Sequence, residues 1–246
     1  MEKEGRLTKE QFGYTMPVDA PLFTKPPIYY RDIEAISITY ETDEDSALDV
    51  LPAGLELAIP ATATVIFLRY PFSTLGPYNE VILGLSCIFD GLPKFYITYI
   101  VVDSDIPLSA GREIWGYPKK FAQITLEKDG DSIIGTMERP RGNRICTGIV
   151  RLEKPLQPTE TGKGGGSISL RVIPNPNGSN DPSIAELIEV PPDNTPIESY
   201  EGSGSVQFNS NSVTDPWHKL VVNKVTMAIY RRYHMVLHPG EVIKRY

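Results

Sequence analysis

The chain has 246 residues, of which 41% are hydrophobic and 22% are charged, so it is long and apolar enough to bury a substantial core. Its formal net charge of −7, without a basic stripe, argues against a nucleic-acid partner. No apolar run approaches the roughly 20 residues of a membrane span, and the polar opening sequence contains no signal-peptide core, so we expect a cytoplasmic protein without a membrane partner.

Short strands are the elements that the sequence predicts most often. Twenty-two prolines and twenty glycines interrupt the chain at short intervals. Between them lie β-branched or aromatic runs, which predict strands at residues 36–40, 64–70, 95–102 and 145–152. We therefore expect a mostly β (α+β) fold with few short helices, built either as a barrel or as two packed sheets.

Helical sequence is scarce. Residues 44–51 are expected to form one short helix, because Thr42 or Asp43 can cap its start and Pro52 ends it. Residues 216–219 predict a turn or a single helical turn.

We expect a single domain over residues 1–246, in which residues 1–25 form an extended N-terminal arm. The most obvious internal break is the sequence T-G-K-G-G-G at residues 161–166. It lacks the G-x-x-x-x-G-K-[ST] pattern of a phosphate-binding loop. We therefore interpret residues 160–167 as a flexible glycine-rich surface loop.

The cysteines and histidines do not predict a metal centre. Cys87 and Cys146 lie in apolar, strand-like sequence and are expected to be buried thiols. The three histidines, His218, His234 and His238, do not have zinc-ligand spacing. No nucleotide-binding motif is visible either, so we expect neither metal nor organic cofactor.

The most informative segment, residues 110–120, reads A-G-R-E-I-W-G-Y-P-K-K. A pair of consecutive lysines is usually a solvated surface feature. Here the pair lies between aromatic neighbours, Trp115 and Tyr117 before it and Phe121 after it.

The pattern G-R-E-x-x-x-Y-P-K-K in this segment resembles the signature of the acetoacetate decarboxylase superfamily. Other parts of the chain are similar to the same family, so that the resemblance runs from about residue 30 to residue 246. These parts are Tyr30-Arg31 with Y-E-T-D at 40–43, G-P-Y-N-E at 76–80, residues 170–188, and the C-terminal part from 215 to 242.

The resemblance implies a β-barrel-like fold with a deep central pocket, a homo-oligomer, and a small-molecule keto acid as substrate. It implies that Lys119 is the Schiff-base lysine, Lys120 its cationic neighbour and Glu80 a catalytic carboxylate. A second family carboxylate would fall near Val65, where the sequence has no acid.

Three further residues are expected to contact the substrate. The resemblance implies that Arg31 binds a substrate carboxylate, and Tyr117 and Trp115 are expected to line the substrate site. We interpret Arg112 and Glu113, in the same motif, as a structural ion pair or as pocket-wall residues.

The chemistry explains why such a site needs a buried lysine. A protonated imine accepts the electrons that a departing carboxylate leaves behind, but only a neutral amine can form it. A free lysine has a pKa near ~10.4, so burial or a neighbouring positive charge must destabilise its ammonium form. Consecutive side chains of a strand leave on opposite faces, so we expect burial to act more strongly on Lys119 than the charge of Lys120.

Three functions remain open from the sequence. The first is a carboxy-lyase that decarboxylates a β-keto acid through a lysine imine and enamine. The second is an aldolase-dehydratase, or another Schiff-base C–C lyase of the superfamily, acting on a keto acid or aldehyde. The third is a non-catalytic β-barrel protein that binds a small molecule.

Overall fold

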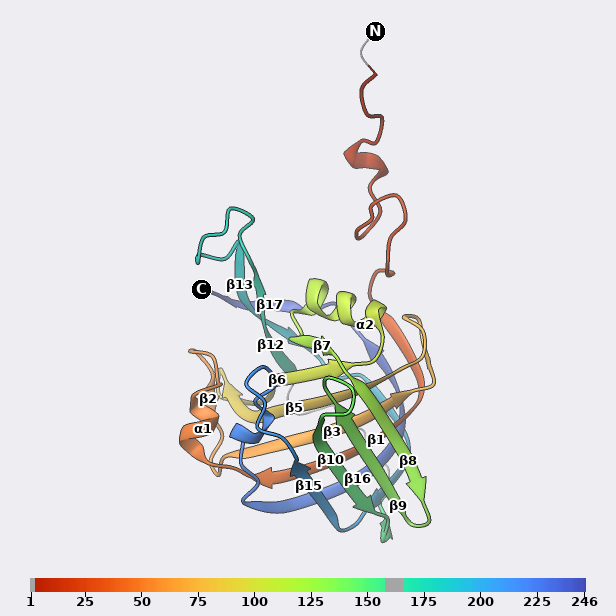
Figure 1. Cartoon of the computed structure of the whole chain (residues 1–246), viewed down its shortest axis with the longest axis vertical. Coiled ribbons are helices and arrows are strands. Elements are labelled where there is room, and N and C mark those ends of the chain that lie inside the picture. The colour runs from red at the N-terminus through yellow and green to blue at the C-terminus, as the bar shows by residue number, and fades with distance from the viewer. Residues whose placement is uncertain (1–2, 158–165) are drawn as a thin grey trace.

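The computed structural model describes residues 3–157 and 166–246. Within them the fold consists of two sheets (Figure 1). The larger sheet follows the path β11-β14-β16-β1-β3-β5-β6-β12-β13-β17, with β2, β4 and β7 pairing beside β5, β1 and β6, and the smaller follows β15-β10-β9-β8.

The strands of the larger sheet are β1 (Ile28–Glu41), β2 (Glu56–Leu57), β3 (Thr62–Tyr70), β4 (Phe72–Ser73), β5 (Tyr78–Phe89), β6 (Leu92–Val102), β7 (Lys119–Phe121), β11 (Lys154–Pro155), β12 (Ser167–Ile173), β13 (Ile184–Val190), β14 (Asn194–Glu201), β16 (Lys224–Leu237) and β17 (Glu241–Arg245). Those of the smaller sheet are β8 (Gln123–Asp129), β9 (Ser132–Glu138), β10 (Arg144–Arg151) and β15 (Gly204–Phe208).

The two faces of the larger sheet bury different sets of side chains, because side chains alternate along a strand. In β3, Val65 and Phe67 join the core that packs against the smaller sheet. Leu68 and Tyr70 belong to a second apolar cluster on the opposite face. The smaller sheet thus closes one face of the larger sheet and leaves the other free to form a pocket.

The expectation of a mostly β fold is confirmed, and so is each of the four predicted strand regions, which fall in β1, β3, β6 and β10. The expectation of a barrel is wrong. The larger sheet ends at β11 on one side and at β17 on the other, and these two strands do not pair with each other. The architecture consists of two packed sheets, which is the other fold that the sequence predicted.

The helices are short. The predicted helix at 44–51 is α1 (Glu44–Leu48), and Asp43 caps it by accepting a hydrogen bond from the Ser46 backbone N–H at 2.9 Å. The predicted turn at 216–219 is a 3₁₀ turn, η3 (Trp217–Lys219), and a similar turn, η1 (Lys9–Gln11), lies near the N-terminus.

One helical segment was not foreseen in the sequence: α2 (Asp105–Ala110) continues into a π-helical turn, η2 (Gly111–Trp115). Pro107 and the nearby glycines have low helix propensity, so the local sequence does not predict a helix here. Pro107 lies in the first turn of α2, where a backbone N–H is not needed.

Several other expectations concern segments at the edge of the described structure. The start of the N-terminal arm, around η1, extends away from the two sheets (Figure 1), whereas Thr15 contacts Glu113 and Phe23 is buried in the cluster on the pocket face. The glycine-rich loop predicted at 160–167 lies outside the described residues as far as residue 165, and Ser167 already begins β12.

In the described parts of the chain, no helix is both long and apolar enough to cross a membrane. Cys87 and Cys146 are buried free thiols, as expected.

Candidate active site

A pocket of about 390 Å³ opens on the face of the larger sheet that the smaller sheet leaves free. Its wall comes from β1, β3, β5, β6, β7 and β16, and the connection between β13 and β14 forms part of its edge. Most of the wall is aliphatic or aromatic. Lys119 and Glu80 are exceptions, and both lie in the buried part of the pocket.

Lys119 and Glu80 form a buried ion pair. The distance from Nζ of Lys119 to Oε2 of Glu80 is 2.7 Å, and the side chains are 5% and 6% exposed. The other oxygen, Oε1, accepts a hydrogen bond from the Tyr70 hydroxyl at 2.9 Å. Within the described residues, the ion pair with Lys119 is the polar contact of Oε2, so this oxygen is placed to exchange a proton with the amine.

Tyrosines surround the ion pair. The Tyr30 and Tyr78 hydroxyls lie 3.1 Å apart, and the Lys119 ammonium lies 5.5 Å and 5.8 Å from the ring centroids of Tyr78 and Tyr117. Burial, as the largest cause, raises the pKa of Tyr30, Tyr70, Tyr78 and Tyr117 above the usual range. These phenols therefore stay neutral at physiological pH and can donate hydrogen bonds inside the pocket.

The glycines of the G-R-E-x-x-x-Y-P-K-K motif make room for this arrangement. A Cβ at Gly111 would lie 2.6 Å from Cδ of Lys119, so the glycine lets the lysine side chain pass. Gly116 ends the π-helical turn in a left-handed conformation (φ 71°), and a Cβ there would meet the backbone of Arg171. The chain then turns into β7, which begins at Lys119.

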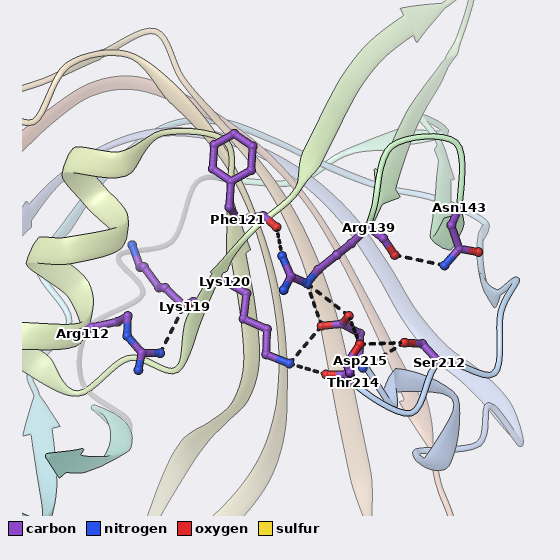
Figure 2. A network of polar contacts seen from close by, with 9 residues as sticks. All are labelled: Arg112, Lys119, Lys120, Phe121, Arg139, Asn143, Ser212, Thr214 and Asp215. Carbon is purple, nitrogen blue, oxygen red and sulfur yellow. Dashed lines mark hydrogen bonds and ion pairs between the residues drawn. The ribbon is translucent and has the colours of Figure 1, made fainter. Parts of the chain in front are cut away.

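Arginines hold the outer edge of β7, which pairs with β6 through its inner edge. Arg112 donates to the carbonyl of Lys119 at 3.2 Å, and Arg139 donates to the carbonyl of Phe121 (Figure 2). Arg112 and Glu113, expected to be an ion pair or pocket-wall residues, do not form an ion pair with each other and do not line this pocket. Glu113 instead accepts a hydrogen bond from the hydroxyl of Thr15 at 2.9 Å.

Lys120 lies outside the pocket. Figure 2 shows its side chain leaving β7 on the side away from Lys119, towards Asp215. Its Nζ lies 3.0 Å from Oδ1 of Asp215 and donates to the carbonyl of Thr214, and 40% of the side chain is exposed. The geometry therefore gives no support to the prediction that Lys120 is a catalytic residue. The side chains of Lys119 and Lys120 leave β7 on opposite faces, as expected of consecutive residues in a strand.

The position of Lys120 leads to a prediction about the pH at which the imine forms. We expect Lys120→Met to shift the pH of half-maximal imine trapping by no more than about 0.5 unit, because a solvent-screened charge contributes well under 1 kcal/mol. Ile100→Thr should shift it upwards by about 1 unit, since Ile100 lines the pocket beside Lys119 and a hydroxyl there would stabilise the ammonium. Borohydride trapping across a pH series measures both shifts. A large shift in Lys120→Met with none in Ile100→Thr would show that the neighbouring charge dominates.

Arg31 and Trp115, predicted to contact the substrate, also lie outside the pocket wall. A bulge at Asp32, which has a positive φ of 59°, interrupts the register of β1 and turns Arg31 outwards over the ring of Tyr29. Trp115 is buried behind Tyr117, stacked on it at a centroid distance of 5.9 Å, and its Nε1 donates to the carbonyl of His238. Tyr117 does line the pocket.

Sequence reasoning did not identify several residues of the pocket wall, among them Tyr70, Arg231 and Tyr233. Arg231, Tyr233 and Met235 alternate along β16 and all line the pocket. The signal that was available is the period of two, which places residues i and i+2 of a strand on one face. Without the fold, that period does not say which face carries a pocket.

The structure also shows where Val65 lies, the position near which the family resemblance implied a second carboxylate. Val65 is fully buried on the opposite face of β3, in the core between the sheets. The pocket face of the same strand carries Ile66 and Leu68. Beside Glu80, β3 therefore presents Ile66, Leu68 and the hydroxyl of Tyr70 to the pocket, and no acid where the family resemblance implied one.

Known proteins resemble this chain over nearly its whole length. The family model described as Acetoacetate decarboxylase (ADC) matches residues 15–246. An acetoacetate decarboxylase of Acidiphilium cryptum (strain JF-5) is 29% identical over 244 residues, which cover 97% of this chain and 98% of that protein.

Solved structures agree with this match. One from structural studies of acetoacetate decarboxylase has a TM-score of 0.90 at 26% identity, over 98% of this chain and 99% of that chain. The enduracididine biosynthesis enzyme MppR, solved in complex with pyruvate, has a TM-score of 0.81 at 22% identity, over 96% and 99% of the two chains. At that identity the likeness to MppR shows a shared fold alone.

Proposed function

The chain belongs to the acetoacetate decarboxylase family, and we propose that it is a Schiff-base-forming lyase that decarboxylates a β-keto acid through Lys119. The observation that carries this proposal is the burial of Lys119 in a largely apolar pocket, with its Nζ 2.7 Å from a buried carboxylate. A lysine with no catalytic task seldom occupies such a position, because an ammonium loses its hydration there.

The reaction follows from the arrangement of these groups. The neutral amine of Lys119 attacks the ketone, and uptake of one proton with loss of water gives a protonated imine. The electrons of the breaking bond to the carboxylate then move into the imine, carbon dioxide leaves, and an enamine remains. Protonation of the enamine carbon and hydrolysis release the ketone and restore the amine.

Glu80 is suited to the proton transfers of this sequence. While Lys119 is an imine, the carboxylate remains beside the cationic nitrogen and stabilises it. Its Oε1 accepts a hydrogen bond from the Tyr70 hydroxyl, and its Oε2 lies 2.7 Å from Nζ of Lys119. We propose that Oε2 carries protons between the substrate and the lysine, and that the neutral tyrosines hold the substrate oxygen atoms.

A second candidate is an aldolase-dehydratase or a related Schiff-base C–C lyase. The observation that favours it is the apolar surface of Ile66 and Leu68 beside Glu80, where the family resemblance implied a second acid. Such an enzyme uses the same imine but joins or cleaves a bond to an aldehyde. We further propose that the protein acts in the cytoplasm as a homo-oligomer, as the family resemblance implies.

One experiment separates the functions that the sequence left open. The protein is incubated with a panel of β-keto acids, α-keto acids and aldehydes, followed by borohydride reduction, intact-mass analysis and measurement of carbon dioxide. An imine with carbon dioxide release supports the decarboxylase, and an imine with bond formation to an aldehyde supports the aldolase-dehydratase. A protein that binds these compounds without forming an imine would be a non-catalytic binding protein.

We expect the activity to need no metal ion. The imine itself accepts the electrons, and the described residues contain no group of three or more histidine, cysteine or acidic side chains placed to hold a metal. Dialysis against a strong chelator should leave turnover unchanged within about twofold, far below the 100-fold or greater loss expected from removing a catalytic group. Loss of turnover that one divalent ion restores would contradict this expectation.

A further inference from the structure

Among the described residues, Arg231 has no ion-pair or hydrogen-bond partner, unlike Arg232 and Arg69 near the same pocket. Its neighbour Arg232 lies 2.7 Å from Oδ1 of Asp32 and 3.2 Å from Oε2 of Glu198, and Arg69 is paired with Glu34. Arg231 lines the pocket, and no ion pair or hydrogen bond joins its guanidinium to another of the described residues. A partly buried cation without a counter-ion is a favourable place for an anionic group of a ligand.

The register of the sheet places Arg231 relative to the reacting groups. Arg231 in β16 is the partner of Ala35 in β1, Ala35 is the partner of Leu68 in β3, and Leu68 is the partner of Glu80 in β5. All four line the pocket. Neighbouring strands are ~4.8 Å apart, so the backbones of Arg231 and Glu80 are about 14 Å apart along the sheet.

Lys119 approaches Glu80 from the other direction. In the sheet, β7 lies beyond β6, so that β16 and β7 are on opposite sides of the pocket, with β1, β3, β5 and β6 between them. The wall between the two cations contains aliphatic side chains such as Ala35, Ile66 and Leu68 beside the tyrosines that surround the ion pair. A ligand that reaches both cations along the aliphatic part of this wall presents a short apolar chain to it.

We propose that Arg231 forms an anion-binding subsite across the pocket from Lys119, so that the substrate is a keto compound with an anionic group, such as a carboxylate, several carbons from its carbonyl. This inference rests on the proposed function for the imine at Lys119. It extends that function, because the anion at Arg231 is distinct from the carboxylate that leaves next to the imine. The preferred β-keto acid is then a dicarboxylate, whose distal carboxylate remains in the product.

Two ketones with the same carbon skeleton test the subsite without relying on decarboxylation. 5-Oxohexanoate carries a carboxylate three methylene groups from its ketone, and 2-hexanone carries a methyl group in its place. We expect the concentration for half-maximal borohydride trapping to be about 10- to 100-fold lower for 5-oxohexanoate, as charge-assisted hydrogen bonds allow. Arg231→Met should remove this preference by raising the half-maximal concentration of 5-oxohexanoate towards that of 2-hexanone, and Arg231→Lys should keep part of it.

Arg69→Met is the matched control, because Arg69 is a paired arginine outside the pocket wall. It should behave as the unmodified protein does. Equal half-saturation for both ketones, or a preference that persists in Arg231→Met, would overturn the subsite while imine formation itself stands. If neither ketone is trapped, the proposed function fails, and calorimetric binding of 5-oxohexanoate to the unmodified protein and to Arg231→Met then decides whether the subsite exists.

Discussion

Replacement of Lys119 by arginine is expected to abolish turnover, with a loss of about 10,000-fold or more, on the order of that seen when a covalent nucleophile is removed. Arginine stays protonated at any pH that the protein survives, so it cannot attack a ketone. It keeps a positive charge beside Glu80, which avoids the roughly 3–5 kcal/mol that an unpaired buried carboxylate would cost. The measurement is carbon dioxide release together with the mass of the protein after borohydride reduction.

The neighbouring lysine supplies the control for this experiment. Lys120→Arg keeps the ion pair with Asp215 on the opposite side of β7 and should retain both turnover and the borohydride adduct. In the unmodified protein, peptide mapping should place the added mass on Lys119. An adduct on Lys120, or one that survives in a folded Lys119→Arg protein, would refute the assignment of the reactive amine.

Glu80→Gln is expected to lower turnover by about 100- to 10,000-fold, the usual cost of removing a general acid or base. Glutamine keeps the shape of the side chain and can still accept the hydrogen bond from Tyr70, but it cannot carry a proton. The imine should still form, because Lys119 remains. The pH of half-maximal trapping should fall, since the negative charge that stabilises the ammonium at 2.7 Å has been removed.

The two readouts together distinguish a catalytic carboxylate from a structural one. A structural role would lower turnover and trapping in parallel, through loss of folded protein. Glu189→Gln, which removes a carboxylate paired with Lys94 outside the pocket wall, is a control for the loss of an ion pair. Unchanged turnover in Glu80→Gln would show that Glu80 is not needed for proton transfer.

The sequence predicted the strands of this protein better than its helices. The strand regions in β1, β3, β6 and β10 are β-branched or aromatic runs between prolines and glycines, a local signal that needs no knowledge of the fold. The helical segment of α2 and η2 has Pro107 inside it and Gly111 and Gly116 near its end, so its local sequence argues against a helix. In the folded protein, Gly111 of this segment leaves room for the side chain of Lys119 on its way into the pocket.

Pocket residues that belong to contiguous sequence motifs were predicted. Pocket residues that come together only through the pairing of distant strands were not. Lys119 and Tyr117 belong to one short segment, and Glu80 to another that resembles the family. Arg31 was chosen from its position in the sequence, but a bulge at Asp32 turns it away, and such a bulge depends on pairing with β4 and β16. Arg231 reaches the pocket through a register that only the folded sheet defines.

The order of strands in the larger sheet has a consequence for how such an enzyme can diversify. Lys119, the proposed imine-forming residue, is carried by β7 and Arg231 by β16, and β1, β3, β5 and β6 lie between them. If the proposed function holds, substitutions in β16 can therefore change which substrate tail is accepted without disturbing Lys119 and Glu80. Substitutions at the two ends of the pocket can therefore be selected or designed independently of each other.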